Sequence, residues 1–336
     1  MLTAEIDLSA IKSNVATIKR RVKTEYYAVV KADAYGHGAV AVAKAIQSIV
    51  DGFAVATDVE AMELVESGIK RPILILGTGI ALRKLSKNVI PSVADVEQIE
   101  RLKGVSDCVH VAVNTGMNRY GCKPEDFGKL IMSADNSGIN VGGAFTHFYR
   151  EIDKNDCAEQ FDKFLSCVLP FRERIRRLHC CASNCLILPE VYHLDAVRVG
   201  LAMYGWGYDD VQPAMKIFTE IAQINYVNKG EHIGYGDYVA EKDMRVATVR
   251  LGYGDGFWRR SEHELVVNGR YCLVVGSVCM DACMIDVSEV RCKIGDRAYI
   301  LSDNEQMTRI CVRHNTISHE VLTMISRRIK RKYVNN

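Results

Sequence analysis

Eight short apolar runs recur along the first two-thirds of this 336-residue chain, and amphipathic helical patterns separate most of them. We predict strands at Tyr26–Lys31, Gly52–Ala56, Ile73–Gly77, Val89–Val93, Cys108–Val113, Val141–His147, Arg177–Ala182 and Ala196–Leu201. Continuous apolar strands that alternate with helices are typical of a parallel sheet covered on both faces. Eight such units favour a (β/α)8 barrel. A doubly wound open sheet is the alternative, but no GxGxxG motif follows any strand to support it.

Helix-start signals stand between the predicted strands. Asp58 and Asp95 place a carboxylate at the start of two amphipathic patterns, and Pro124 stands where proline fits the first turn of a third. An apolar run over Ala39–Val50 predicts a helix soon after the first strand. These signals support helical connections between parallel strands.

After about Trp206 the pattern changes, because strand-like runs follow one another with only Gly, Asp or Asn turns between them. The predicted strands are Glu220–Val227, His232–Val239, Arg245–Leu251, Leu265–Val267, Tyr271–Val278, Cys283–Val287 and Arg297–Ser302. We therefore predict a second domain of mostly antiparallel strands. The tail from Ser318 to Lys332 reads as a helix.

Charge and composition exclude several classes of protein. Lys+Arg 43 against Asp+Glu 41 gives a net charge of +2, which argues against a dedicated nucleic-acid surface. No apolar run approaches the ~20 residues of a membrane span. The N-terminus carries Glu5 and Asp7 and has no apolar core, unlike a signal peptide. We expect a cytoplasmic protein, whose basic run Arg327–Lys332 is interpreted as a solvated helix end.

The 12 cysteines lie mostly in apolar runs, where a reduced thiol packs as a small hydrophobic group. No paired CxxC knuckle with clustered histidines accompanies them. We therefore predict reduced cysteines and no metal site.

The first predicted strand runs into the segment Tyr26-Tyr27-Ala28-Val29-Val30-Lys31-Ala32-Asp33-Ala34-Tyr35-Gly36-His37-Gly38. Partial desolvation at a strand end lowers the pKa of an ammonium group and frees its lone pair for nucleophilic attack. Taken alone, a strand-end lysine is more often a solvated charge. The whole string resembles the pyridoxal-phosphate motif of the alanine racemase family. There the lysine, here Lys31, holds the cofactor as a Schiff base, and the nearby tyrosine, here Tyr35, binds its phosphate.

Four further strings resemble the same family in the same order, namely 114–121, 198–205, 230–236 and 278–281. The resemblance covers essentially the whole chain. It implies a barrel over residues 9–212 that binds pyridoxal 5'-phosphate. It also implies a β domain over residues 213–336, which a short N-terminal strand within residues 1–8 joins.

The resemblance implies a role for each matching residue. Arg119 contacts the phenolic oxygen of the cofactor and the carboxylate of the substrate, since its planar fork matches oxyanions. Arg198 meets the pyridine nitrogen as a donor, because it stays protonated itself. Further cofactor contacts are implied for His147, Ser183, Gly200 and Leu201, and substrate contacts for Tyr253, Met280 and His319. Outside the resemblance, His147 is equally compatible with a core histidine and Ser183 with a helix cap.

Inversion of a stereocentre requires a proton to leave one face and arrive on the other. The resemblance implies one base per face, Lys31 and Tyr235, in a homodimer with shared active sites where Tyr235 comes from the partner subunit. Outside its motif, such a tyrosine would usually be a half-buried strand residue.

The chain departs from the family pattern close to these residues. Ala112 stands where the family commonly has a carbamylated lysine that steers the arginine, so either Asn114 or a small anion such as chloride is expected beside Arg119. His319 stands where tyrosine is usual, and relatives with a smaller polar group there include the serine racemases of vancomycin resistance. Two further departures, near the path of the substrate, are the segment 148–152 and Ser277.

We predict a pyridoxal-phosphate-dependent racemase that interconverts L-alanine and D-alanine. A serine or mixed serine/alanine racemase is the alternative, because of His319. A decarboxylase of the same architecture usually presents a cysteine and an acidic pyridine partner, where this chain offers Tyr235 and Arg198. A non-catalytic pyridoxal-phosphate-binding barrel has no β domain, so the β domain predicted for this chain counts against that alternative.

Overall fold

The computed structural model describes residues 2–79, 84–150, 154–259 and 263–335. The chain divides into two compact units. The barrel unit comprises Lys12–Ala34 and Ala39–Met203, and the β-domain unit comprises Met1–Ile11, Tyr35–Gly38 and Tyr204–Asn336. Among the described residues, no helix has both the length and the apolar character needed to cross a bilayer.

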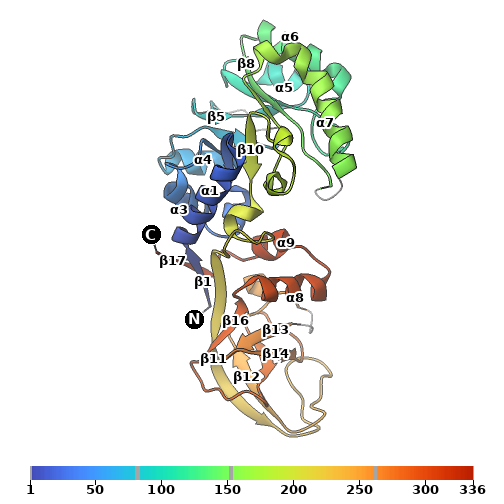
Figure 1. Cartoon of the computed structure of the whole chain (residues 1–336). Coiled ribbons are helices and arrows are strands. Elements are labelled where there is room, and N and C mark those ends of the chain that lie inside the picture. Colours follow the sequence, from blue (N-terminus) through green and yellow to red (C-terminus); the bar gives the residue numbers. More distant parts are fainter. Residues whose placement is uncertain (1, 80–83, 151–153, 260–262, 336) are drawn as a thin grey trace. The chain divides into compact units, whose positions relative to one another are not determined.

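The barrel unit holds two parallel sheets, of strand order β10-β2-β3-β4-β5 and β6-β7-β8-β9 (Figure 1). Pro91, which has no amide hydrogen, separates β5 from β6, so the single predicted run Val89–Val93 forms two short strands. The Asp195 amide donates to the Leu178 carbonyl, which links the start of β10 to β9. These connections close the ring of strands predicted for a (β/α)8 barrel.

The strands of this ring are β2 (Glu25–Val29), β3 (Gly52–Val55), β4 (Ile73–Ile75), β5 (Val89–Ile90), β6 (Ser92–Val93), β7 (Cys108–Ala112), β8 (Asn140–Phe145), β9 (Arg177–His179) and β10 (Ala196–Val199). The helices of this part of the chain are α1 (Leu8–Val22), α3 (Ala39–Ile46), α4 (Asp58–Glu66), α5 (Val96–Arg101), α6 (Phe127–Asn136) and α7 (Lys154–Val168). The segment α2 (Lys31–Tyr35) is a left-handed turn rather than a regular helix. Short 3-10 helices follow several of them, including η3 (Ser183–Leu186) and η5 (Leu201–Tyr204).

Side-chain caps explain where two of these helices begin. Thr57, rather than the predicted Asp58, caps α4, because its hydroxyl accepts from the Glu60 amide while the Glu60 carboxylate accepts from the Thr57 amide. Asp95 caps α5 as predicted, since its carboxylate accepts from the Gln98 amide at 2.8 Å.

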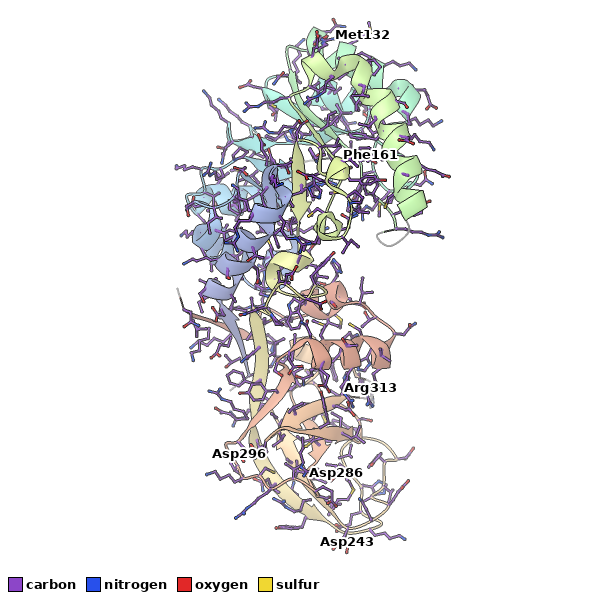
Figure 2. The ribbon with its side chains drawn as sticks, viewed as in Figure 1. Met132, Phe161, Asp243, Asp286, Asp296 and Arg313 are labelled. Carbon is purple, nitrogen blue, oxygen red and sulfur yellow. The ribbon has the colours of Figure 1, made fainter. Side chains whose placement is uncertain are left out.

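Apolar side chains fill the space between the strands β6–β9 and the helices α5, α6 and α7. Val111, Phe127 and Phe164, which come from β7, α6 and α7, are each at most 1% exposed. Met132 lies on the outer side of α6 and is 63% exposed (Figure 2). The helices therefore turn one apolar face to the strands and the other face to solvent.

The β-domain unit is built on one eight-stranded sheet of order β12-β15-β14-β13-β16-β11-β1-β17. β11 also pairs with β12, with a register shift between Ile221 and Gln223, so the sheet curls back on itself. All pairs are antiparallel except β1 with β17. The N-terminal strand joins this sheet, as the resemblance implied, because β1 pairs with β11.

The strands of the β domain are β1 (Thr3–Asp7), β11 (Met215–Val227), β12 (Met244–Val249), β13 (Glu264–Val267), β14 (Arg270–Val275), β15 (Cys283–Asp286), β16 (Arg297–Leu301) and β17 (Lys330–Val334). Its helices are α8 (Asn304–His314) and α9 (Ser318–Thr323), with the 3-10 helix η6 (Tyr253–Asp255).

The strand predicted at His232–Val239 is wrong. These residues form a loop that a single bridge between His232 and Val239 closes. Gly234 and Gly236 have φ angles of 71° and 86° there, a left-handed conformation that interrupts a strand. Most residues of this loop are therefore exposed, and Ile233 alone among them is buried.

The predicted helix from Ser318 to Lys332 is also wrong beyond Thr323, where α9 ends. The basic run continues into the strand β17, which pairs with β1 at the edge of the sheet. Lysines are favoured on edge strands because their charge discourages further pairing. The pattern of the tail alone did not show that β1 offers it a free backbone edge.

The helix α8 was not predicted. Its start is capped by Asp303, whose carboxylate accepts from the Gln306 amide, and it ends at Asn315 with a left-handed φ of 50°.

All 12 cysteines are free, as predicted. The buried ones are Cys122, Cys157, Cys180, Cys181, Cys185, Cys272 and Cys283.

Candidate functional site

Lys31 stands two residues beyond the end of β2, whose last four residues are buried. Residues 32–35 then turn left-handed, with φ between 51° and 54°. This conformation costs L-residues roughly 1–2 kcal/mol each, so the surrounding structure has to hold it. The Ala34 amide donates to the Val30 carbonyl, and the Asp33 carboxylate accepts from the Ala39 amide at the start of α3.

Glu60 holds the first residue of this turn. Its Oε1 accepts from the Ala32 amide at 2.7 Å, and its Oε2 accepts from the Ala56 amide at 2.7 Å. The same carboxylate completes the capping box of α4. One side chain therefore ties the residue after Lys31 to the start of a rigid helix.

The surroundings of Lys31 lower the pKa of its amine. Burial is the largest cause, the nearby charges of Arg119 and Arg198 act in the same direction, and Glu60 opposes them. A lowered pKa raises the neutral, nucleophilic fraction of an amine. The lysine-motif prediction thus finds physical support in the structure.

Arg119 lies on the loop 113–122. The Cys122 amide donates to the Ala112 carbonyl, and the Asn114 amide donates to the Cys122 carbonyl, so backbone hydrogen bonds close the base of the loop. Gly121 has a φ of 113°, and a Cβ on it would lie 2.5 Å from the Asn114 nitrogen. Glycine is therefore required where the loop returns.

Asn114 does not pair with Arg119. Its Oδ1 accepts from the amides of Gly116 and Asn118, and its Nδ2 donates to the Asn118 side chain at 2.9 Å. Among the described residues, the contact seen for the exposed Arg119 guanidinium is with the ring of Tyr120, 5.7 Å from its centroid. The expected role of Asn114 is thus wrong, and a small anion beside Arg119 stays a prediction.

Arg198 on β10 is 3% exposed and makes three hydrogen bonds. It donates to the carbonyls of Thr146 and Cys180 and to Nδ1 of His179. His179 contacts Nδ1 of His110 through its own Nε2, at 2.9 Å. Because arginine only donates, His179 carries its hydrogen on Nε2, and His110 carries its hydrogen on its own Nε2.

Both of these histidines are neutral at physiological pH. Burial, reinforced by nearby arginine charges, lowers the pKa of His110 to about 3 and that of His179 well below its usual value. Burial also lowers the pKa of Arg198 to about 10, so the guanidinium stays charged. Arg198 is therefore the cation of this hydrogen-bonded chain.

Ser183 lies opposite the residues that follow β10. Its hydroxyl oxygen accepts from the amides of Gly200 at 3.2 Å and Ala202 at 3.3 Å. Leu201, between them, starts η5. The two amides converge on the hydroxyl oxygen, a grouping of backbone donors that suits an anion.

His147 follows β8 and is half-buried. Burial is the main cause that lowers its pKa to about 3, followed by the charges of Arg198, Arg119 and Lys31. These electrostatic effects show that the structure brings the four predicted residues of the barrel unit together.

In the β-domain unit, aromatic side chains gather around Tyr35. The centroid of its ring lies 5.0 Å from that of Tyr204 and 5.7 Å from that of His319. His37 stacks on Tyr204 at 4.5 Å. The unusual His319 is thus in direct contact with the tyrosine predicted to bind the cofactor phosphate.

The remaining predicted residues are exposed in the β domain, where Tyr253 starts η6 and Met280 and Tyr235 lie on loops. Tyr253 is 41% and Met280 is 54% exposed. Their segments are joined, because the Tyr253 amide donates to the Cys279 carbonyl. Tyr235 is 70% exposed on the loop 232–239, which excludes the half-buried strand position considered from its sequence.

Sequence reasoning missed Glu60, Gln160, His110 and His179. The capping-box spacing of Thr57 and Glu60 was visible in the sequence, but nothing there indicated that Glu60 also holds the turn after Lys31. Gln160 is a polar residue within the otherwise amphipathic α7, and it proves to be 3% exposed.

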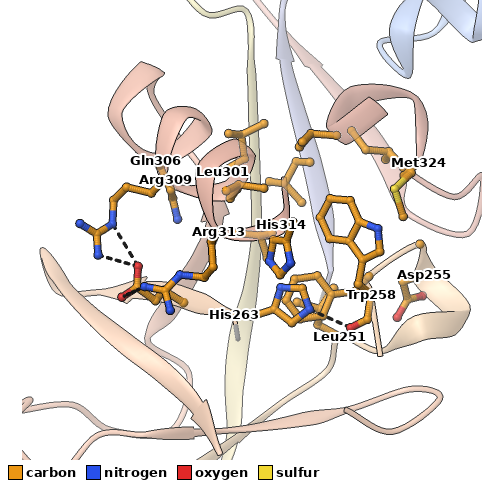
Figure 3. A pocket seen from close by; sticks show the side chains of 18 of the residues that line it. Leu251, Asp255, Trp258, His263, Leu301, Gln306, Arg309, Arg313, His314 and Met324 are labelled. Carbon is orange, nitrogen blue, oxygen red and sulfur yellow. Dashed lines mark hydrogen bonds and ion pairs between the residues drawn. The ribbon is translucent and has the colours of Figure 1, made fainter. Parts of the chain in front are cut away.

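A cavity of about 60 Å³ lies elsewhere, within the β domain (Figure 3). Trp258, His263 and His314 stack along one wall, with ring centroids 4.7 Å apart for Trp258 and His314. Arg309 and Arg313 both pair with Glu264 at its rim. Lys31, Arg119 and Arg198 are not among its lining residues, so the cavity does not mark the chemistry of the lysine motif.

Comparisons with known proteins agree with the motifs. Residues 6–207 match the family model of the alanine racemase N-terminal domain, and residues 214–333 match that of the C-terminal domain. An alanine racemase of Clostridium perfringens is 35% identical, covering 99% of this chain and 95% of the relative. One of Thermodesulfovibrio yellowstonii is 36% identical, covering 99% of this chain and 98% of the relative.

Solved structures give the same result. The alanine racemase of Clostridium difficile 630 has a TM-score of 0.93 at 33% identity, covering 99% of this chain and 95% of that one. The alanine racemase of Bacillus anthracis with bound L-Ala-P has a TM-score of 0.91 at 30% identity, covering 100% and 95%. The resemblance and the predicted fold class are confirmed: this chain belongs to the alanine racemase family.

Proposed function

We propose that this protein is a pyridoxal-phosphate-dependent racemase that interconverts L-alanine and D-alanine. The observation that carries the proposal is the placement of Lys31, whose half-buried amine stands just beyond a strand end, with its pKa lowered by burial and further by Arg119 and Arg198. Similarity along nearly the whole chain to alanine racemases supports alanine as the substrate. The match of residues 214–333 argues against a barrel-only cofactor binder.

The residues present fit pyridoxal 5'-phosphate. Lys31 offers an amine. The amides of Gly200 and Ala202, which donate to the Ser183 oxygen in this structure, are backbone donors of the kind that binds a phosphate, and the Ser183 hydroxyl is a further donor beside them. By the family's pattern, Tyr35, His147, Leu201 and Arg119 complete the contacts. When bound, the cofactor acidifies the α-hydrogen of the amino acid by withdrawing electrons from it.

Arg198 fits the place beside the pyridine nitrogen, because it is buried, charged and fixed by three acceptors. A guanidinium donates to that nitrogen and keeps its own proton. With the cofactor bound, Arg198 would therefore not protonate the ring nitrogen, which would limit electron delocalisation into the ring and favour return of the proton over transamination.

Two bases exchange the α-proton, one on each face of the substrate. Lys31 accepts it as a neutral amine, a state that its lowered pKa favours. The exposed Tyr235 suits the second base if it reaches the site of another chain, so we infer a homodimer in which the partner subunit's Tyr235 completes each site.

The test is incubation of purified protein and cofactor with L-alanine, L-serine and other L-amino acids, followed by chiral chromatography. We expect D-alanine, and we expect Lys31→Ala to lose both racemisation and the visible absorption of lysine-bound cofactor. Lys129→Ala, at an exposed lysine paired with Asp126, is the matched control and should change neither. An unchanged visible spectrum in Lys31→Ala would overturn the assignment of that lysine.

The shared site has its own test. Lys31→Ala and Tyr235→Phe are each expected to be inactive. Mixing them with subunit exchange should restore up to about a quarter of wild-type activity, because one of the two sites in a mixed dimer carries neither lesion. No recovery despite demonstrated exchange would refute the shared site.

A further inference from the structure

Gln160 is a buried amide at the centre of a polar cluster in the barrel unit. It lies on α7 and is 3% exposed, and both ends of its side chain are engaged. Its Nε2 donates to the Thr115 hydroxyl at 2.9 Å and to the His147 carbonyl at 3.2 Å. Its Oε1 accepts from the Tyr149 amide at 3.1 Å.

The directions of the hydrogen bonds in this cluster follow from the donors available. Thr146 Oγ1 lies 2.9 Å from the Val113 carbonyl, which only accepts, so the Thr146 hydroxyl donates there. Thr115 Oγ1 lies 2.7 Å from Thr146 Oγ1 and must therefore donate to it. The Thr115 oxygen accepts in turn from Gln160. The hydrogen bonds therefore run in one direction, from the Gln160 amide through Thr115 and Thr146 to the Val113 carbonyl.

The cluster connects the loop that carries Arg119 to the backbone segment that contacts Arg198. Thr115 and Val113 belong to the start of the Arg119 loop, and both are at most 4% exposed. Thr146 directly follows β8, and its carbonyl accepts from Arg198 at 2.8 Å. A Cβ on Gly116 would lie 3.3 Å from the ring of Tyr149, so the two segments also pack against each other.

We propose that Gln160, acting through Thr115 and Thr146, is a positioning residue that holds the Arg119 loop against the segment of His147. This inference rests on the proposed racemase function. The chain has Ala112 and no acidic partner for Arg119 among the described residues, so neutral hydrogen bonds at the base of the loop hold the backbone from which Arg119 extends. Buried polar groups hold one geometry when all of their bonds are made.

The proposal predicts which kinetic constant changes. Arg119 contacts the substrate carboxylate in the proposed site, so a loosened loop weakens substrate binding. The turn that follows Lys31 is held separately, because Glu60 accepts from the Ala32 amide. Loss of the Gln160 amide should therefore raise KM for L-alanine about tenfold, with a smaller change in kcat and an intact absorption band of lysine-bound cofactor.

The experiment compares Gln160→Leu with Gln306→Leu. Gln306 is 1% exposed and also bonds through both ends of its side chain, but to Tyr299 and Ser302 in the β domain. Both variants lose a buried amide, and only Gln160→Leu should raise KM. Amide hydrogen exchange of the protein without added cofactor should also become faster at residues 113–122 in Gln160→Leu, and not in Gln306→Leu.

A second pair covers the case in which Gln160→Leu does not fold. Thr115→Val removes the hydroxyl at nearly constant volume and should raise KM, whereas Thr115→Ser keeps the hydroxyl and should retain the wild-type KM. Equal KM values for Gln160→Leu and wild type, or for Thr115→Val and Thr115→Ser, would overturn the proposal. Absence of racemisation by the wild-type protein would instead overturn the proposed function.

Discussion

Glu60 supports the turn beside Lys31, and its carboxylate also opposes deprotonation of the Lys31 amine. Its negative charge raises the pKa of the amine against the effects of burial and of Arg119. Glu60→Gln should therefore lower that pKa further. Capture of pyridoxal phosphate by the cofactor-free protein requires the neutral amine of Lys31. The pH at which the capture rate is half-maximal should therefore be lower in Glu60→Gln than in the wild type.

Glu97→Gln is the control for this prediction, because Glu97 is an exposed carboxylate that pairs with Arg101. Its midpoint should equal that of the wild type. A midpoint that rises in Glu60→Gln would show that the carboxylate acts on Lys31 in another way.

His319 bears on substrate choice. The family usually has tyrosine at position 319, whereas this chain has a histidine whose ring contacts Tyr35. Imidazole is shorter than a phenol and can hydrogen-bond at both of its nitrogens. A hydroxymethyl group beside it would gain roughly 0.5–1.5 kcal/mol from one hydrogen bond. We therefore expect alanine turnover with measurable serine turnover, and His319→Tyr should lower the serine-to-alanine ratio of kcat/KM. An unchanged or raised ratio would favour an alanine-only enzyme.

The sequence led to the site residues that stand in motifs and missed those defined by distant contacts. Lys31, Arg119 and Arg198 were identified from strings of neighbouring residues. Glu60 and Gln160 bond to residues 28 and 45 positions away, and only the folded chain brings these partners together.

At the scale of elements, the left-handed turn over residues 32–35 stores backbone strain next to the lysine. Ala32 has a φ of 51° and an exposed side chain, so substitutions there act mainly through the backbone. Ala32→Val should lower the free energy of unfolding by about 1–2 kcal/mol, because branched side chains are disfavoured at positive φ. Ala32→Gly relieves this strain and should lie close to the wild type.

Urea denaturation of the two variants checks this prediction, since neither removes a side-chain hydrogen bond. If Ala32→Val proves as stable as Ala32→Gly, the turn is not under the strain inferred from its dihedral angles.

Burial on both faces explains why the barrel strands were predictable, since it produces continuous apolar runs such as that of β3. Elements whose partners are remote were not predictable. β17 forms a strand because β1 offers it a backbone edge with which to pair. The local sequence pattern alone predicted a helix there. The loop 232–239 has strand-like composition, but Gly234 and Gly236 are left-handed there.

At the scale of the whole molecule, buried neutral histidines make the fold sensitive to acid. Burial lowers the pKa of His110 and His147 to about 3 and that of His263 to about 4. The unfolded chain binds protons on these groups near pH 6.5, so it holds more protons than the folded chain below that pH. Stability should therefore fall as the pH drops from about 7 toward 4, by up to about 1.4 kcal/mol per pH unit for each histidine.

Urea midpoints at pH 7, 6 and 5 measure this dependence. His263→Phe removes one titrating group from a stacked aromatic cluster and should flatten the decline. A midpoint that rises on acidification would contradict the assignment of these histidines as neutral.

Two buried cysteines, Cys122 and Cys283, report the opening of the units in which they lie. Burial raises the pKa of Cys122 and Cys283 to about 12, so neither presents a thiolate while its unit is closed. A thiol reagent consequently records how often each unit has opened, since Cys122 belongs to the barrel unit and Cys283 to the β-domain unit. Mass spectrometry of briefly labelled protein thus distinguishes cooperative opening, with both sites marked in the same molecules, from independent opening of either unit.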